Sequence, residues 1–149
     1  MRTLRLLVTF YTIYLKMSNL KIYKKIFSLK TVAVVGFSPK KERASNYVSS
    51  YMQMNGFNII PVNPNYSSID GKKCYKSLTQ IKEKIDVVNI FRNSNFAYPV
   101  VKEAILINVA AIWMQDGVHS IEAFNLANDK NVMIIMDDCI MRRHIELYK

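Results

Sequence analysis

The sequence predicts a doubly wound α/β fold, in which a mainly parallel five-stranded sheet carries helices on both faces within a single domain. Three observations predict it. Five short runs rich in β-branched residues recur along the chain, as expected for strands buried on both faces. Longer segments with apolar residues three and four apart separate most of these runs. The chain has 149 residues, half of them apolar, which suffices for one hydrophobic core.

The alternation begins at Thr31. The predicted strands are residues 31–35, 57–62, 85–91, 109–113 and 132–136, and the predicted crossover helices are residues 44–55, 95–108 and 120–130. Residues 66–84 contain Gly71 and a potential capping Ser77, which indicates a loop with a minor helix. Because such crossovers are right-handed and cover both faces of the sheet, the arrangement is Rossmann-like.

Residues 1–30 form a basic extension ahead of the domain at residues 31–149. Arg2 and Arg5 precede an apolar run at residues 6–15, which is shorter than the roughly 20 residues of a membrane span, so stable membrane insertion is not expected. Three alternatives stay open: a later start at Met17, a targeting sequence such as an organelle address, and a membrane-surface anchor. Residues 20–29 predict a short amphipathic helix that packs on the sheet edge.

The positive charge is concentrated at the N-terminus. Nine of the 21 Lys and Arg residues lie within residues 1–41, which contain no acid, whereas the other twelve accompany all eleven acids. A nearly neutral domain disfavours nucleic acid as a partner. Two cysteines, Cys74 and Cys139, are too few for a disulfide framework, and no cluster has the spacing of a metal site. These features favour a reducing compartment, the cytoplasm.

The turn after the first predicted strand suits a phosphorylated ligand. Gly36 permits a tight turn, and the following helix N-terminus offers free N–H groups. The turn also supplies a hydroxyl donor and three cations, at Ser38, Lys40, Lys41 and Arg43. The sequence lacks G-x-G-x-x-G, and its second strand ends in Pro-Val-Asn-Pro without the acid that would bind a ribose. NAD is therefore disfavoured.

Six ordered segments resemble the small stand-alone CoA-binding domain proteins, which are related in fold to the CoA-binding domain of the succinyl-CoA synthetase alpha subunit. The resemblance extends from Thr31 to about Leu147. Its carriers are AVVGFSPK at 33–40, GF at 56–57 with IPVNPNY at 60–66, GKKCY at 71–75, DVV at 86–88 with FR at 91–92, IWMQ at 112–115, and DC at 138–139 before MRRH at 141–144.

The resemblance implies that the chain binds coenzyme A. It implies phosphate contacts at the turn, a border to the adenosine part after the second strand, and a groove towards the pantetheine arm. The residues in these roles are, in that order, Gly36, Phe37, Ser38, Lys41 and Arg43; Asn63 and Pro64; and Phe91, Arg92, Trp113 and Gln115. Core packing is an equally weighted alternative for Trp113.

The leading prediction is a non-catalytic module that binds CoA or an acyl-CoA. Asp116, Asp137 and Asp138 follow predicted strands, but no neighbouring His or Ser completes a catalytic triad or a metal cage. The alternatives are an enzyme of acyl or nucleotide chemistry that uses the same groove, with Cys139 as a candidate thiol, and a different nucleotide ligand such as NAD. A homodimer through a sheet edge or a helix face is left open.

Overall fold

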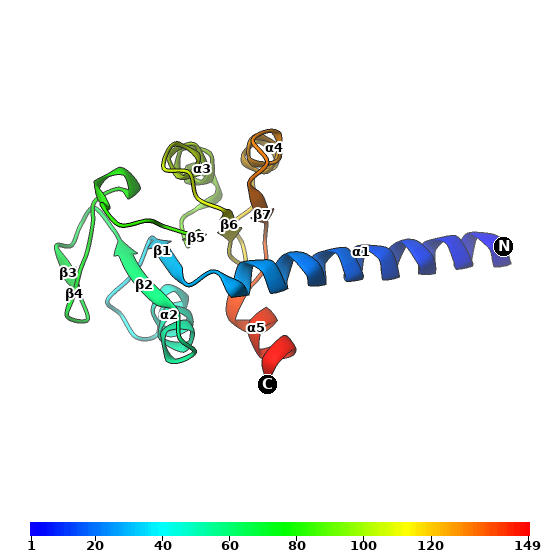
Figure 1. Ribbon diagram of the computed structural model, residues 1–149, viewed down its shortest axis with the longest axis horizontal. Helices are drawn as coiled ribbons and strands as arrows, with labels where there is room; N and C mark the ends of the chain where they lie inside the picture. The colour runs from blue at the N-terminus through cyan, green and yellow to red at the C-terminus, as the bar shows by residue number, and fades with distance from the viewer.

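A computed structural model describes residues 1–149 as a five-stranded parallel sheet with the strand order β2-β1-β5-β6-β7 (Figure 1). The order reverses between β1 and β5, so the sheet is doubly wound, as predicted. The strands are β1 Thr31–Val35, β2 Asn58–Val62, β5 Val87–Ile90, β6 Ala111–Met114 and β7 Met133–Ile135. Every pair in this sheet is parallel, which confirms the predicted fold class.

Five α-helices cover the two faces of the sheet. Helices lie on both faces, and the long first helix projects beyond the domain (Figure 1). The first face is covered by α3 Ala97–Leu106 and α4 Ile121–Asp129, preceded by the 3₁₀ turn η2 Ser94–Phe96. The second is covered by α2 Ala44–Met54, α5 Ile140–Tyr148 and the last turns of α1 Arg2–Ser28.

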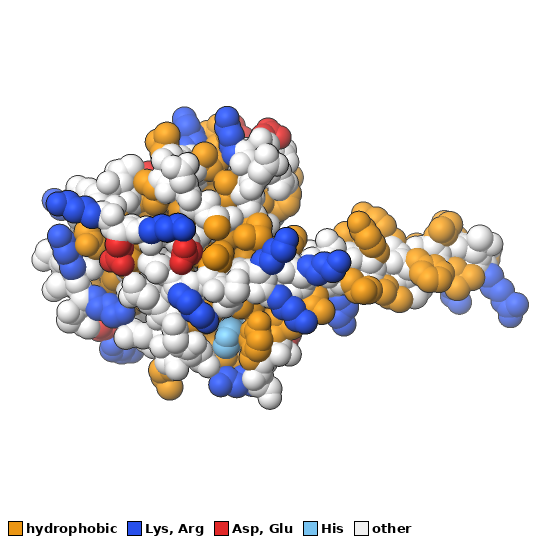
Figure 2. Space-filling view, viewed as in Figure 1, with side chains coloured by type: hydrophobic (Ala, Val, Ile, Leu, Met, Phe, Trp, Pro, Cys, Tyr) orange, Lys and Arg blue, Asp and Glu red, His pale blue; other side chains and the backbone are white.

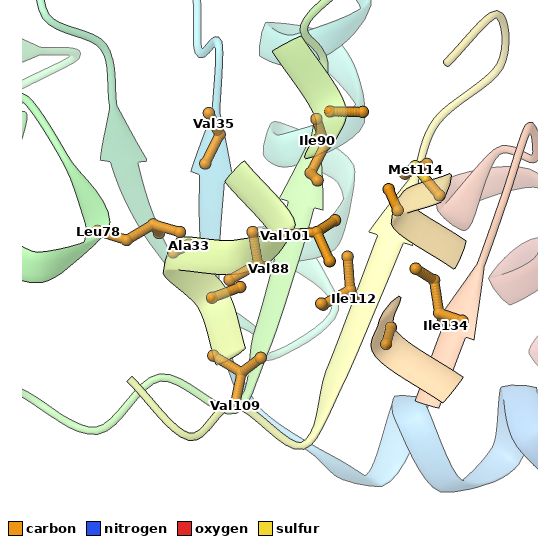
Figure 3. Close-up of a cluster of buried hydrophobic side chains, with 14 of the residues drawn as sticks. Ala33, Val35, Leu78, Val88, Ile90, Val101, Val109, Ile112, Met114 and Ile134 are labelled. Carbon is orange, nitrogen blue, oxygen red and sulfur yellow. The ribbon is translucent and has the colours of Figure 1, made fainter. Parts of the chain in front are cut away.

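Successive strand residues alternate between two hydrophobic cores, because side chains along a strand point to opposite faces. In β1, Ala33 and Val35 enter the core beneath α3 and α4, whereas Val32 and Val34 enter the core beneath α1, α2 and α5. Figure 3 shows the first of these cores, where β-strand side chains such as Val88 and Ile112 point towards the helices. All four named residues of β1 and both labelled residues are buried.

Most predicted elements are present with slightly different ends, and the segment at residues 66–84 differs in kind. It contains a small antiparallel hairpin, β3 Ser68–Ile69 with β4 Lys72–Lys73, before the 3₁₀ turn η1 Leu78–Gln80. Ser77 stands at the N-cap position of η1, but its side chain makes no capping hydrogen bond. Two-residue strands are too short to produce a visible alternation, which is why the hairpin was missed.

The predicted short helix at residues 20–29 was wrong in its length. The structure has one continuous helix of 27 residues, α1. Residues 2–28 contain no Gly or Pro to interrupt it, and it ends where Leu29 turns to an extended conformation before β1. Ile26 and Phe27 are buried in the core, whereas residues 1–17 are all exposed. No helix in the structure has the length and apolar content needed to cross a membrane.

Asp138 fastens α1 to the domain. Its carboxylate accepts hydrogen bonds from the hydroxyl of Tyr23 in α1 (2.9 Å), from Arg143 Nε (2.7 Å) and from Arg142 Nη2 (3.0 Å). Burial alone would raise the pKa of Asp138, but the hydrogen bonds from Arg143 and Tyr23 outweigh burial and hold that pKa below its ordinary value. Burial and the bond to Asp138 raise the pKa of Tyr23 to about 12, so its hydroxyl remains a donor.

An Asp138→Asn protein is expected to be about 2 kcal/mol less stable than the wild type at pH 7, because a buried carboxylate with several donors is lost. Since the folded pKa of Asp138 is depressed, its stabilisation is complete above the ordinary Asp pKa of about 4 and is lost as the pH falls below that value. Urea unfolding at pH 7 and pH 3 should show the difference narrowing at pH 3. An Asp129→Asn control, at an exposed carboxylate, should show little difference at either pH; an unchanged gap for Asp138→Asn would contradict the prediction.

Candidate functional site

The carboxyl ends of β2, β1 and β5 meet at Gly36, which follows β1. Gly36 N donates to Val62 O at the end of β2 (3.0 Å), and Phe91 N, after β5, donates to Val35 O (2.9 Å). Gly36 has a φ of 84°. A Cβ atom added there would lie 2.9 Å from Phe91 O and 3.1 Å from Arg92 Cδ. The turn therefore needs glycine both for its backbone conformation and for its close approach to the next strand.

Two buried side chains at the start of α2 form hydrogen bonds with the backbone that follows Gly36. Ser45 Oγ accepts from Ser38 N (3.0 Å), and Asn46 Nδ2 donates to Ser38 O (2.8 Å). Both Ser45 and Asn46 are buried, at 4% and 1% exposure. Ser38 Oγ in turn accepts from Lys40 N (3.2 Å). These bonds fix the path of the turn relative to the helix that follows it.

A cavity of about 380 Å³ opens between this turn and the first turn of α2. Arg43 is the N-cap residue of α2, and no side chain caps the helix there, so the helix presents free N–H groups and the positive end of its dipole. Lys40 and Arg43 are exposed and form no ion pair. The cavity is thus suited to a phosphate group. Its lining residues are Gly36, Ser38, Lys40, Arg43, Ala44, Ser45 and Phe91.

Lys41 is directed to a different partner. Its ammonium group lies 2.8 Å from Asp70 Oδ1, at the tip of the β3–β4 hairpin. Asp70 Oδ2 also accepts from Asn46 Nδ2 (3.1 Å), so Asn46 links the hairpin tip to Ser38 O. The hydrogen bond from Lys41 is the main cause that lowers the pKa of Asp70. Lys40 therefore lines the cavity, and Lys41, the predicted phosphate contact, does not.

Asn63, directly after β2, forms hydrogen bonds that support the turn after Gly36. Its Nδ2 donates to Phe37 O (2.8 Å), and its Oδ1 accepts from Asn65 N (3.0 Å). The side chain at this position is thus committed to the protein's own backbone. Pro64, the next residue, is exposed and is not among the residues that line the cavity. Phe37 itself is 5% exposed and packs into the core, so its side chain does not line the cavity.

Phe91 and Arg92 lie on the other side of Gly36 and are both half-buried. Phe91 contributes to the cavity wall. The guanidinium of Arg92 lies over the ring of Phe96, with 4.4 Å between the guanidinium carbon and the ring centroid. Of the predicted residues, the structure thus brings together Gly36, Ser38, Arg43 and Phe91 at one cavity, with Phe37, Asn63 and Arg92 adjoining it.

Trp113 and Gln115 are not brought to the cavity. Trp113 is fully buried, its ring stacks on those of Tyr23 and Phe27 in α1, and its Nε1 donates to Asp138 O (2.8 Å). Gln115 is 3% exposed and donates from Nε2 to Asn89 Oδ1 (2.8 Å). The alternative of core packing therefore describes the position of Trp113.

Two larger hollows lie elsewhere, along α1. One of about 760 Å³ lies beside β7, and one of about 790 Å³ lies beside α5. Both contain Arg143, which is paired with Asp138 and Glu146, and the first contains Arg142, which is paired with Asp116 and Asp138. Arginines already neutralised in this way are weak anion sites. The second hollow also contains Lys16, which forms no ion pair, but neither hollow combines an unpaired cation with a glycine turn. The smaller cavity at Gly36 is therefore the better candidate for a phosphorylated ligand.

Sequence reasoning missed the supporting residues Ser45, Asn46 and Asp70. Ser45 and Asn46 are polar residues on the buried side of α2, and a break in its apolar pattern could have indicated them. Asp70 has a φ of 51° and stands in an Asp-Gly pair, which is typical of hairpin turns. Its contact with Lys41 joins residues 29 positions apart, and no local sequence pattern predicts such a contact.

Comparisons with known proteins agree with this architecture. Residues 30–145 match the model of a family described as CoA binding domain. The uncharacterized protein YneT of Bacillus subtilis (strain 168) is 39% identical over 115 residues, which cover 77% of this chain and 85% of YneT. The structure of a hypothetical protein from Pyrococcus horikoshii OT3 superposes with a TM-score of 0.84 at 34% identity, over 87% of this chain and 92% of that one.

A further relative is much longer than this chain. The ADP-forming acetate–CoA ligase of Methanocaldococcus jannaschii is 29% identical over 129 residues, which cover 79% of this chain but 18% of the ligase. The similarity is thus to one part of that enzyme. The family match spans more than three quarters of the residues, including the Gly36 turn and every strand of the sheet. The chain therefore belongs to the CoA-binding domain family.

Proposed function

We propose that this protein binds coenzyme A or an acyl-CoA, with the phosphates of the ligand in the cavity between Gly36 and the first turn of α2. The observation that carries the proposal is the meeting of an uncapped helix N-terminus with two unpaired cations, Lys40 and Arg43, beside a glycine turn. Family membership supports the choice of CoA among phosphorylated ligands.

Each part of the site has a role suited to CoA. Backbone N–H groups at the start of α2 suit the pyrophosphate oxygens. The guanidinium of Arg43, on a long exposed side chain, suits a phosphate monoester such as the 3′-phosphate, because guanidinium binds phosphate oxygens in a bidentate manner. The exposed Pro64 loop after β2 borders the adenosine part, and Phe91 leads towards the pantetheine arm.

The groups that line the cavity favour ligand binding over catalysis. It consists of backbone donors, two hydroxyls, two cations and an aromatic ring, groups that hold an anion in place. The thiol of Cys139, the candidate for an enzymatic role, is buried at the start of α5 and is not part of the cavity lining. We therefore propose a binding module, one that holds CoA for a partner or responds to its concentration.

Calorimetric titration of CoA, dephospho-CoA and NAD into the full chain tests the proposal. CoA is expected to bind more tightly than dephospho-CoA, and both more tightly than NAD. Arg43→Ala and Lys40→Ala should each weaken CoA binding about tenfold, because each removes a charge-assisted contact to phosphate.

Lys41→Ala provides the matched control. It removes the same charge from the adjacent position, but the ammonium of Lys41 is held by Asp70, so the loss should stay below about threefold. No CoA binding, or a preference for NAD, would overturn the proposed function. An equal loss for Lys40→Ala and Lys41→Ala would leave CoA as the ligand but contradict the assignment of Lys40.

A further inference from the structure

The projecting part of α1, residues 2–17, has two different sides. Polar side chains follow one another at intervals of three, four, three and four residues, and so form a single stripe along the helix. With Thr3 as the one exception, every other residue of this segment is apolar. The stripe consists of Arg2, Arg5, Thr9, Thr12 and Lys16, and the apolar face of Leu4, Leu6, Leu7, Val8, Phe10, Tyr11, Ile13, Tyr14, Leu15 and Met17.

The apolar face is exposed and wide. Leu7, Phe10 and Tyr14 are 61%, 66% and 69% exposed, and Figure 2 shows hydrophobic side chains along the projecting helix, with Lys and Arg at its outer tip and near its junction with the domain. A helix that is apolar on most of its circumference normally has a partner on that surface. Most helical stability in proteins comes from packing of an apolar face, and this face is exposed, so a partner would also stabilise this part of the helix.

The apolar face is directed away from the domain. Continued by the same intervals, the polar stripe passes through Asn19 to Tyr23 and Ile26, which is the side of α1 that docks on the domain. Residues seven apart share one side of a helix, so the apolar side that carries Tyr14 and Met17 continues into Lys21 and Lys24. A flat partner could therefore contact the apolar face and these lysines together, with the domain on the opposite side.

We propose that this face of α1 binds an anionic lipid surface, with the helix lying along the membrane. The helix cannot cross a bilayer, but its apolar face can enter the boundary between headgroups and acyl chains. Lys21, Lys24 and Lys25 then lie at the level of the lipid phosphates and attract them. Residues 1–41 contain no acid that would oppose this attraction.

Charge argues against a second copy of the chain as the partner. Lys21 and Lys24 continue the apolar side of the helix: a parallel pair packed through this side places them next to the same lysines of the second copy, and an antiparallel pair that aligns the two apolar faces places them near the other copy's Arg2. Neither arrangement offers an acidic residue to balance the charge, because α1 has none. Like charges in close contact oppose association, whereas anionic lipid is complementary to all of these cations.

Co-sedimentation of the full chain with vesicles tests the proposal. One set of vesicles contains equal parts of phosphatidylglycerol and phosphatidylcholine, and the other contains phosphatidylcholine alone. The protein is expected to bind the anionic vesicles at least tenfold more tightly than the neutral ones, with affinity falling as salt is added. Leu7→Glu, in the apolar face, should weaken binding to anionic vesicles at least tenfold.

Thr9→Glu is the matched control, since it adds the same charge on the polar stripe; it should weaken binding less than threefold. Both sites are exposed and remote from the core, so thermal unfolding and CoA titration should be unchanged in both variants, which keeps this test separate from that of the proposed function. Failure to sediment with anionic vesicles, or equal losses for Leu7→Glu and Thr9→Glu, would overturn the proposal. So would a vesicle-independent dimer that Leu7→Glu dissociates, because it would make a second copy the partner.

Discussion

A Gly36→Ala protein is expected to lose about 3 kcal/mol of unfolding free energy and at least tenfold in CoA affinity. The φ of 84° at Gly36 costs an L-residue roughly 1–2 kcal/mol. The added Cβ would also lie 2.9 Å from the backbone oxygen of Phe91, and only a shift of the turn can relieve that contact. Such a shift moves Ser38 away from the first turn of α2, where the phosphates are proposed to bind.

Gly56→Ala separates the two causes. Gly56 has a similar φ of 90°, but a Cβ atom there meets nothing within 4 Å, so only the conformational cost of roughly 1–2 kcal/mol should remain. Urea unfolding and CoA titration of both variants give the comparison. Equal losses of stability in the two variants, with CoA affinity unchanged, would show that the approach to Phe91 has no role in the site.

Trp113→Ala is expected to destabilise the protein by about 4 kcal/mol, because removal of a fully buried aromatic side chain leaves a large cavity. The lost ring also stacks on Tyr23 and Phe27, and its Nε1 donates to Asp138 O. Chemical denaturation measures the change. Trp113→Phe keeps most of the packing and loses the hydrogen bond, so its cost should be about 1–2 kcal/mol.

CoA titration of Trp113→Phe distinguishes packing from ligand contact. If the ring serves only the core, the folded variant binds CoA within twofold of the wild type. A tenfold loss in a variant that remains fully folded would instead place Trp113 at the ligand and contradict the packing seen between β6 and α1.

The order of elements was predictable because each strand has its own compact apolar run. Residues 31–35 match β1, and the other four strands lie within or one residue beyond their predicted ranges. What could not be predicted is which face each side chain occupies. Trp113 and Met114 are neighbours in one apolar strand, and only the pairing of β6 with β5 and the placement of α1 decide that Trp113 faces α1.

One part of the candidate site was predictable from the sequence, and another part was not. Gly36, Ser38 and Arg43 lie within one strand-turn-helix unit, so local pattern placed them near each other, and the structure agrees. The distinction between Lys40 and Lys41 depends instead on Asp70, whose hairpin returns to the turn from 29 positions along the chain. A contact of that separation is set by tertiary folding, and the six matching segments could not supply it.

The two halves of α1 differ in their contact with the domain. The domain packs against Ile22, Tyr23, Ile26 and Phe27 of α1, whereas nothing upstream of Met17 is buried. A chain that begins at Met17 would therefore retain every α1 residue that covers Trp113, and a chain that begins at Thr31 would leave that ring uncovered. The upstream half of α1 can therefore be added or removed without altering the core.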